Sequence, residues 1–174
     1  MSGERSSDPW SGPSRAVDLD RVEVLVLTVG DREHAFPVGD VIEVVRMVDV
    51  TPLPEAPAWV AGVINMRGRI VAVIDLRMRL GMSPREPELS TPIIVVGRSE
   101  PAAGLIADGV SEVLALASEA VEPRQPHAAP ALAVSGMAHA GDRLIVLLDP
   151  KRLCDNTSHL SLSADADARA DAGR

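Results

Sequence analysis

Short runs of apolar residues, broken at intervals by glycine, proline and charged residues, fill most of the chain. Val, Ile, Leu and Ala supply nearly all of the apolar content, and the abundance of β-branched residues favours strands over helices. Residues 22–30 (VEVLVLTVG) predict a strand that ends at the turn signal Gly30-Asp31. Residues 34–47 (HAFPVGDVIEVVRM) are expected to continue as a meander, with Pro37 at an edge or a strand start. The pattern therefore predicts an all-β protein.

A further hairpin is predicted at residues 62–76, which have the sequence GVINMRGRIVAVIDL. Two apolar runs flank the dipeptide Arg67-Gly68, and we expect Gly62, Gly68 and Asp75 to shape the turns of this segment. The residues that follow (LRMRLGM) predict one or two short helical turns ended by a glycine. Asp75 is expected to cap them.

The second half of the chain repeats the pattern of the first. A shift of 69 residues places VGDVIEVV (38–45) over ADGVSEVL (107–114), and it aligns Val41 with Val110 and Glu43 with Glu112. Such matched order predicts a duplicated structural unit.

A shift of 74 residues extends this repeat. It places GVINMRGRIVAVID (62–75) over GMAHAGDRLIVLLD (136–149), so that Asp75 aligns with Asp149. The five-residue difference between the two shifts falls in the proline-rich loop EPRQPHAAP (122–130), the counterpart of the loop TPLPEAP (51–57). We therefore predict two similar antiparallel β units around a shared core, because each is too small to be stable alone.

Composition and charge exclude several classes of function. A net charge of −8 argues against nucleic acid as a partner, since phosphate affinity requires clustered positive charge. The aromatic residues are only Trp10, Phe36 and Trp59, too few to stack the bases of an oligonucleotide. No run of about 18 uncharged apolar residues predicts a membrane-spanning helix. The single cysteine, Cys154, excludes an internal disulfide and suits a reducing cytoplasm.

The sequence contains no catalytic constellation. The four histidines lack metal-ligand spacing, and we expect no metal and no cofactor: His34, His127, His139 and His159. Neither a phosphate-binding glycine loop nor a G-x-S-x-G motif is present, so we expect no enzyme. Cys154 has no base near it and is expected to end a buried strand or turn. A regulatory β-barrel that binds a small molecule stays open as the alternative, against the scarcity of aromatic residues.

The only basic cluster is formed by the arginines Arg67, Arg69, Arg77, Arg79 and Arg85. We expect a solvated face there, and alternation places Arg69 and its counterpart Arg143 outside their strands. Arg67 differs, because Gly141 aligns with it in the second copy. The nearest candidate partner is Glu43. We expect only the first half to carry an exposed Glu–Arg pair, which suggests a surface used for recognition.

These motifs identify a family. The segments FPVGDVIEVV, TPLPEAPAWVAGVINMRG, VAVIDLRMRLG, GLIADGVSEVL and GDRLIVLLD, in this order, resemble the CheW-like domain, the coupling adaptor of bacterial chemotaxis. The resemblance covers about residues 20 to 155. It implies two packed SH3-like five-stranded β-barrels around a third apolar core, in agreement with the repeat.

The resemblance also implies a function and partners. Such proteins are non-catalytic scaffolds that link the cytoplasmic tip of a chemoreceptor to the regulatory domain of a CheA-type histidine kinase. In the family, the groove between the barrels takes the receptor tip, and Val41, Glu43 and Arg67 stand at the motif positions for that contact. The kinase contact uses barrel ends and is not assigned to residues. We expect a cytoplasmic protein located at receptor arrays and not inserted into the membrane.

The expected organisation has three parts. Residues 1–18 are rich in Ser, Gly and Pro and predict a flexible arm, and residues 156–174 are rich in Ala and Asp and predict an acidic flexible tail. Residues 19–155 form the predicted CheW-like domain.

Overall fold

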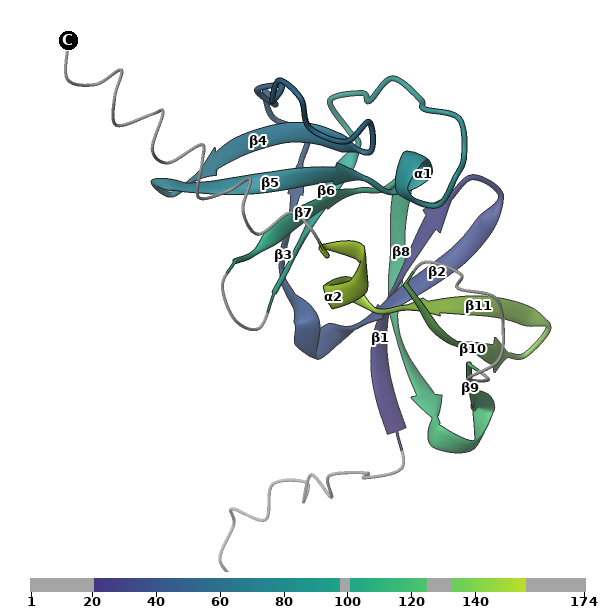
Figure 1. Cartoon of the computed structure of the whole chain (residues 1–174). Helices are drawn as coiled ribbons and strands as arrows, with labels where there is room; N and C mark the ends of the chain where they lie inside the picture. The colour runs from purple at the N-terminus through teal and green to yellow at the C-terminus, as the bar shows by residue number, and fades with distance from the viewer. Residues whose placement is uncertain (1–20, 98–100, 125–132, 156–174) are drawn as a thin grey trace, which may run out of the picture.

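Strands arranged in two sheets dominate the computed structural model, which describes residues 21–97, 101–124 and 133–155 (Figure 1). The predicted arm (1–18) and tail (156–174) lie outside the described residues. The two described helices contain four residues each, and no described helix has the length and apolar content needed to cross a bilayer.

The first sheet has six strands in the order β8-β1-β2-β11-β10-β9. Their bounds are β1 (Arg21–Val29), β2 (Arg32–Pro37), β8 (Gly109–Ala117), β9 (Val121–Pro123), β10 (Val134–Ala140) and β11 (Arg143–Leu148). The second sheet has five strands in the order β3-β6-β7-β5-β4. Their bounds are β3 (Val41–Arg46), β4 (Val60–Met66), β5 (Arg69–Asp75), β6 (Pro92–Val96) and β7 (Ala103–Ile106).

Short connections close both sheets into barrels. In the six-stranded sheet, the edge strands β8 and β9 are joined only by the 3-10 turn η2 (Ser118–Ala120), so they act as one strand that spans both edges. In the five-stranded sheet, Thr51 follows the edge strand β3 and pairs with Val63 of the opposite edge strand β4, with N–O distances of 2.9 and 2.8 Å. Both barrels are therefore five-stranded, as predicted.

One barrel is inserted into the other. Strands β3 to β7 are consecutive in the chain and lie between β2 and β8 of the other sheet. We call residues 41–106 the inserted barrel, and the barrel of β1, β2 and β8–β11 the terminal barrel. The chain passes between them twice, through the 3-10 turn η1 (Val38–Asp40) and through residues 107–108.

This topology corrects two predictions. Residues 34–47 do not form a meander, because β2 ends at Pro37 and η1 carries the chain into the other sheet, where β3 begins. The units are also not purely antiparallel: β2 pairs in parallel with β11, and β5 pairs in parallel with β7. A parallel pair arises where the chain returns by a crossover connection instead of a hairpin.

The predicted repeat is present in the strand pairings. A β-bulge falls between Val41 and Glu43 in β3, and another between their counterparts Val110 and Glu112 in β8. A bulge adds one residue to a strand and so reverses the face of the sheet toward which each later side chain points. Bulges at matching positions therefore show that the two copies pair their strands in the same register.

The hairpins carry a second matched pair of bulges, after Val60 in β4 and after Val134 in β10. Gly62 and Gly136 follow these bulges. A Cβ at Gly62 would overlap the Thr51 carbonyl oxygen, and one at Gly136 would lie 2.6 Å from that of Glu122. Gly62 was predicted to shape a turn, but it lies within β4. Its lack of a side chain leaves room there for the backbone of Thr51, which closes the barrel.

The proline-rich loops also supply the closing pairs. Glu122 and Pro123, placed in a loop by the sequence, pair with β10 as part of β9. Thr51, at the start of the other loop, forms the equivalent bridge to β4. The rest of the second loop from residue 125 lies outside the described residues.

Three apolar clusters stabilise the molecule. The terminal barrel encloses one that includes Val24 and Val26, and the inserted barrel encloses one that includes Ile93. The third lies between the barrels and includes Leu25 and Leu27. Successive residues of β1 thus point into different cores, which explains why its sequence is a continuous apolar run instead of an alternating one. The third core implied by the resemblance is present.

A one-turn helix follows each hairpin. Asp75 precedes α1 (Leu76–Arg79), and its carboxylate accepts a hydrogen bond of 3.2 Å from the Met78 amide. Asp149 precedes α2 (Pro150–Leu153), and its carboxylate accepts one of 2.9 Å from the Lys151 amide. The predicted capping role of both aspartates is confirmed.

Candidate functional site

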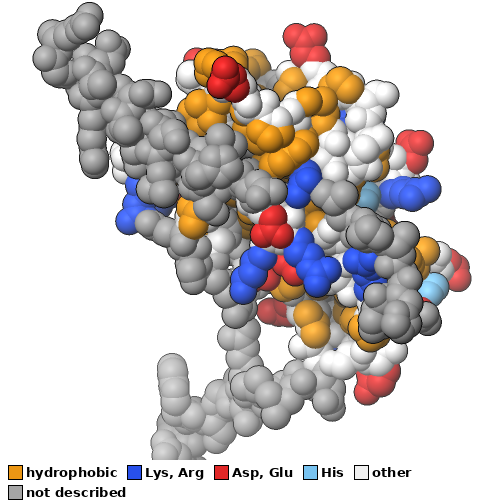
Figure 2. All heavy atoms as spheres, viewed as in Figure 1, with side chains coloured by type: hydrophobic (Ala, Val, Ile, Leu, Met, Phe, Trp, Pro, Cys, Tyr) orange, Lys and Arg blue, Asp and Glu red, His pale blue; other side chains and the backbone are white. Residues whose placement is uncertain are grey.

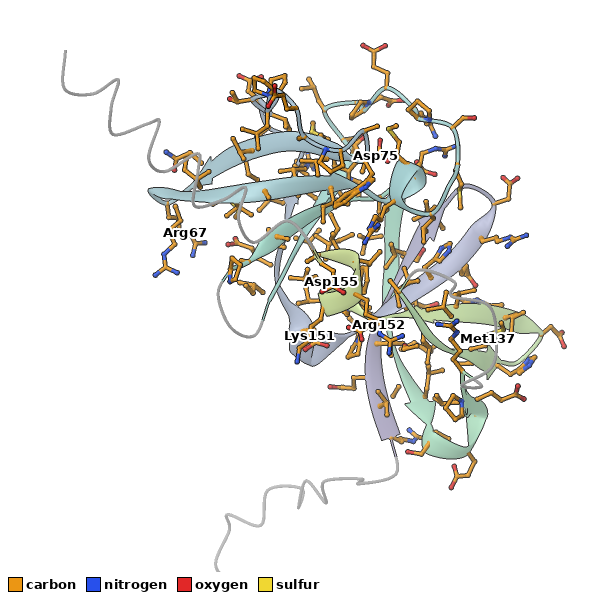
Figure 3. The ribbon with its side chains drawn as sticks, in the orientation of Figure 1. Arg67, Asp75, Met137, Lys151, Arg152 and Asp155 are labelled. Atoms are coloured by element: carbon orange, nitrogen blue, oxygen red, sulfur yellow. The ribbon has the colours of Figure 1, made fainter. Side chains whose placement is uncertain are left out.

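Arg67 and Glu43 form an ion pair on the inserted barrel. The Arg67 Nη2 atom lies 3.2 Å from the Glu43 Oε2 atom, and the two side chains are 84% and 27% exposed. Arg67 lies at the tip of the β4–β5 hairpin and extends away from the body of the molecule (Figure 3). The hairpin brings it to β3, where Glu43 lies. The predicted partnership of these two residues is confirmed.

The backbone of Arg67 is unusual for an arginine. Its φ is +52°, and Gly68 follows with a φ of +82°. Two successive residues with positive φ form the tight turn that best fits a two-residue hairpin, a turn that glycine and asparagine normally occupy. The Asn65 carboxamide oxygen stabilises it by accepting a hydrogen bond of 2.9 Å from the Gly68 amide. The left-handed conformation costs Arg67 about 1 kcal/mol, which its counterpart Gly141 (φ +63°) avoids.

Val41 does not share a face with Glu43. The bulge between them lets Val41 pair with Val96 and pack against the shared core, whereas Glu43 pairs with Val95. Val41 is half-buried. The structure therefore brings Glu43 and Arg67 together and places Val41 beneath the same strand, on the side of the core.

Two exposed apolar side chains neighbour Glu43 along β3. Ile42 is 54% exposed and Val44 is 44% exposed, on either side of Glu43. We call Ile42, Glu43, Val44 and Arg67 the β3 surface. The sequence analysis missed the two apolar residues, although the signal was available: VIEVV is apolar on both faces of the strand, and exposed apolar side chains that gather in one place mark interaction sites.

The second barrel also carries a Glu–Arg pair, which corrects the prediction that only the first half does. The Arg143 Nη1 atom lies 2.7 Å from Glu112 Oε1, and its Nη2 atom lies 2.7 Å from Glu33 Oε1. The hydrogen bond from Arg143 lowers the pKa of Glu33, and both carboxylates raise the pKa of Arg143. The expected solvated face at Arg143 is thus a three-residue ion network.

The two barrels differ in which arginine makes the pair. In the terminal barrel it is Arg143, the counterpart of Arg69, and its backbone lies in β11. In the inserted barrel it is Arg67, in the turn. The unusual feature of the first copy is therefore the position of its arginine at an exposed hairpin tip, not the presence of an ion pair.

Two grooves between the barrels, lined by described residues, do not include the predicted site residues. A groove of about 590 Å³ is lined by Arg32, His34, Trp59, Met78, Arg79, Leu80, Gly81, Met82, Val134, Val146 and Leu148. A smaller one of about 180 Å³ is lined by Asp40, Val96, Gly97, Pro101, Pro150, Lys151 and Cys154. Neither includes Val41, Glu43 or Arg67. In the view of Figure 2, Lys and Arg side chains gather around α2, which includes Lys151 and Arg152.

Two arginines expected in a solvated face lie at the junction of the barrels. Arg77 pairs with Asp108 at 2.6 Å, and the two side chains are only 22% and 15% exposed. Arg79 stacks on the Trp59 ring at 4.2 Å from its centroid. Periodicity could not show this, because α1 is too short to define a face.

The remaining titratable groups fit structural roles. His34 is buried in β2, and burial lowers its pKa. Cys154 is the residue that ends α2, half-buried, and burial raises its pKa to about 12, which keeps the thiol protonated and unreactive at neutral pH. Within the described ranges, no three His, Cys, Asp or Glu side chains are grouped as metal ligands. His127 and His159 lie outside those ranges.

Residues 23–158 match the family model of the CheW-like domain. The chain belongs to the CheW-like domain family. It is 33% identical over 134 residues to the chemotaxis protein CheW of Klebsiella aerogenes, covering 75% of this chain and 80% of that protein. It is 30% identical over 137 residues to CheW of Thermotoga maritima, covering 79% and 90%.

A solved CheW-like structure has the same fold. The crystal structure of the scaffolding protein TtCheW from Thermoanaerobacter tengcongensis superposes with a TM-score of 0.71 at 32% identity, covering 79% of this chain and 94% of that one. The two-barrel architecture expected from the resemblance is thereby confirmed.

Proposed function

We propose that this protein is a non-catalytic scaffold that couples chemoreceptors to a CheA-type histidine kinase, and that the β3 surface contacts the receptor tip. Membership of the CheW-like family supports the coupling role, and the relatives give no support to the alternative of a small-molecule-binding barrel. The kinase regulatory domain is the proposed second partner, and receptor arrays are the proposed location.

The observation that carries the site assignment is the backbone of Arg67. Arg67 has a φ of +52°, and the aligned position in the second half of the chain is glycine. An arginine in this conformation lowers the stability of the folded state relative to glycine. The side chain is 84% exposed and stabilises no core, so the cost does not serve the fold. A contact outside the molecule explains it.

The chemistry of the β3 surface suits the edge of an amphipathic helix. Ile42 and Val44 offer apolar contact, and the Glu43–Arg67 pair presents both charges beside them. An exposed pair of this kind contributes only about 0–1 kcal/mol to folding. Its charges act instead on the orientation and choice of partner, because a like charge opposite either residue is repelled.

The test is charge reversal at Arg67 in a reconstituted complex of receptor fragment, kinase and adaptor. We expect Arg67→Glu to place two acidic side chains together and to abolish receptor-dependent kinase activation, with an unchanged far-UV circular dichroism spectrum. Kinase autophosphorylation and receptor co-sedimentation are the measurements.

Arg85→Glu is the matched control. Arg85 is also an exposed arginine in an ion pair, with Glu88 at 3.4 Å, but it lies in the loop between α1 and β6. It should retain full activation. Normal receptor coupling by a folded Arg67→Glu protein would contradict the site assignment, and failure of the wild-type protein to couple would contradict the function.

A further inference from the structure

The helix α1 bonds the inserted barrel to the terminal barrel through Arg77. Its Nη1 atom lies 2.6 Å from Asp108 Oδ2, and its Nε atom donates a hydrogen bond of 2.9 Å to the Ser83 carbonyl oxygen. Arg77 therefore makes two bonds that hold its guanidinium in one orientation. Partial burial of both charges strengthens the pair relative to one in water.

Asp108 is located where the chain returns to the terminal barrel. It lies between Ile106, the last residue of β7, and Gly109, the first of β8. The same Oδ2 atom that binds Arg77 accepts a hydrogen bond of 2.6 Å from the Gly30 amide, in the turn between β1 and β2. One carboxylate oxygen thus joins α1 of the inserted barrel to the first hairpin of the terminal barrel.

Arg79 forms a second connection on the same helix. Its Nε atom donates to the Leu153 carbonyl oxygen at 3.1 Å, and its Nη2 atom donates to that of Arg152 at 3.1 Å. These carbonyls belong to α2, which follows the last strand of the terminal barrel. The guanidinium also stacks on Trp59 of the inserted barrel.

The repeat does not keep the residues that make these connections. In the second copy, Lys151 aligns with Arg77 and Leu153 with Arg79, and Gly39 aligns with Asp108. Leu153 is buried in the shared core, and glycine has no carboxylate. Arg77, Arg79 and Asp108 are therefore not part of the repeated sequence pattern.

We propose that Arg77 and Asp108 are positioning residues, which fix the angle between the two barrels and so the geometry in which the adaptor holds its partners. The inference rests on the proposed coupling function. Only two chain crossings link the barrels, and the shared core between them consists of apolar contacts, which have no directional preference. A charged hydrogen bond is directional, so it selects one angle among those that the core tolerates.

The experiment measures the barrel angle and the coupling in the same proteins. Spin labels at Arg46→Cys on the inserted barrel and Asp142→Cys on the terminal barrel, in a Cys154→Ser background, report the distance distribution by pulsed electron resonance. Both label sites are exposed. Arg77→Met and Asp108→Asn remove the pair from either side. Arg85→Met is the control, because Arg85 lines the same pocket as Arg77 and Asp108 but its ion pair is with Glu88 of its own loop.

We expect a wider or shifted distance distribution for both junction variants, and coupling to the kinase reduced on the order of tenfold at saturating receptor. Arg77→Lys, which keeps the charge, should restore part of both. Asp108→Asn retains an acceptor for the Gly30 amide and provides the test if Arg77→Met does not fold.

Wild-type distances and wild-type coupling in a folded Asp108→Asn protein would overturn the inference. A lower melting temperature with a narrow distribution and normal coupling would also overturn it, since that result would assign the pair to stability alone. If the wild-type protein itself did not couple receptor to kinase, the proposed function would be contradicted. The distance measurement would still test whether Arg77 and Asp108 fix the angle between the barrels.

Discussion

Arg67 adopts a left-handed backbone conformation that is unfavourable for an arginine. The turn that it occupies requires a positive φ, which glycine adopts without cost, and Gly141 occupies the matching turn of the terminal barrel. The exposed ion pair with Glu43 contributes only about 0–1 kcal/mol to folding, which does not exceed that conformational cost. Under the proposed site assignment, stability and receptor contact therefore make opposite demands at this position.

We predict that Arg67→Gly separates these two demands. Removal of the strained side chain should leave the free energy of unfolding unchanged or raise it by about 1 kcal/mol, because relief of strain offsets the lost pair. Receptor coupling should fall sharply at the same time. Chemical denaturation and the kinase assay are the measurements, and a less stable variant with normal coupling would contradict the prediction.

At the scale of elements, glycines decide whether the barrels close. Gly62 lies in β4 with a φ of +147°, and the backbone of Thr51 occupies the space that a Cβ would need. Gly68 lies in a turn with a φ of +82°, and nothing lies within 4 Å of its Cβ position. The first glycine is required by space and conformation together, and the second by conformation only.

Alanine substitution should rank these glycines. We predict that Gly68→Ala lowers the free energy of unfolding by about 1 kcal/mol, the cost of a left-handed residue. Gly62→Ala should cost more than about 3 kcal/mol, because the closing bridge between Thr51 and Val63 must separate or shift. Urea denaturation of both variants provides the comparison, and equal losses would contradict this account of closure.

The elements also show what the sequence could reveal. Apolar runs, the turn glycines Gly30 and Gly68 and the caps Asp75 and Asp149 are local features, and each was predicted correctly, whereas Gly62 lies in β4. Strand pairing is not local, so the meander through residues 34–47 was wrong. The same limit applies to Val41: alternation places it beside Glu43, and a bulge of one residue separates them. The partnership of Glu43 with Arg67 could be predicted because the repeat singled out Arg67.

At the scale of the whole molecule, acid should weaken the fold in two separate ranges of pH. Burial lowers the pKa of His34 from its usual value of 6.5, so the unfolded chain binds a proton more readily than the folded one. Arg143 lowers the pKa of Glu33 below 4.5 in the same sense. A group whose pKa is depressed on folding destabilises the fold as the pH falls past its unfolded value.

We predict that the free energy of unfolding begins to fall below about pH 6.5 because of His34, and falls further below about pH 4.5 because of Glu33. His34→Ala, which copies the counterpart Ala103, should remove the dependence in the upper range even if it lowers stability overall. Glu33→Gln should affect only the lower range. Urea titrations at several pH values test this, and an unaltered upper range in His34→Ala would contradict the assignment.

The insertion of one barrel into the other sets an order for folding during synthesis. When residue 106 has left the ribosome, all five strands of the inserted barrel are available, whereas β1 and β2 still lack the four strands that complete their own sheet. The face of this hairpin that carries Val24 and Val26 must wait for residues 109–148, where its core partners lie. That face of the nascent hairpin is therefore open to aggregation until those residues emerge, whereas the opposite face, with Leu25 and Phe36, can already pack on the completed inserted barrel.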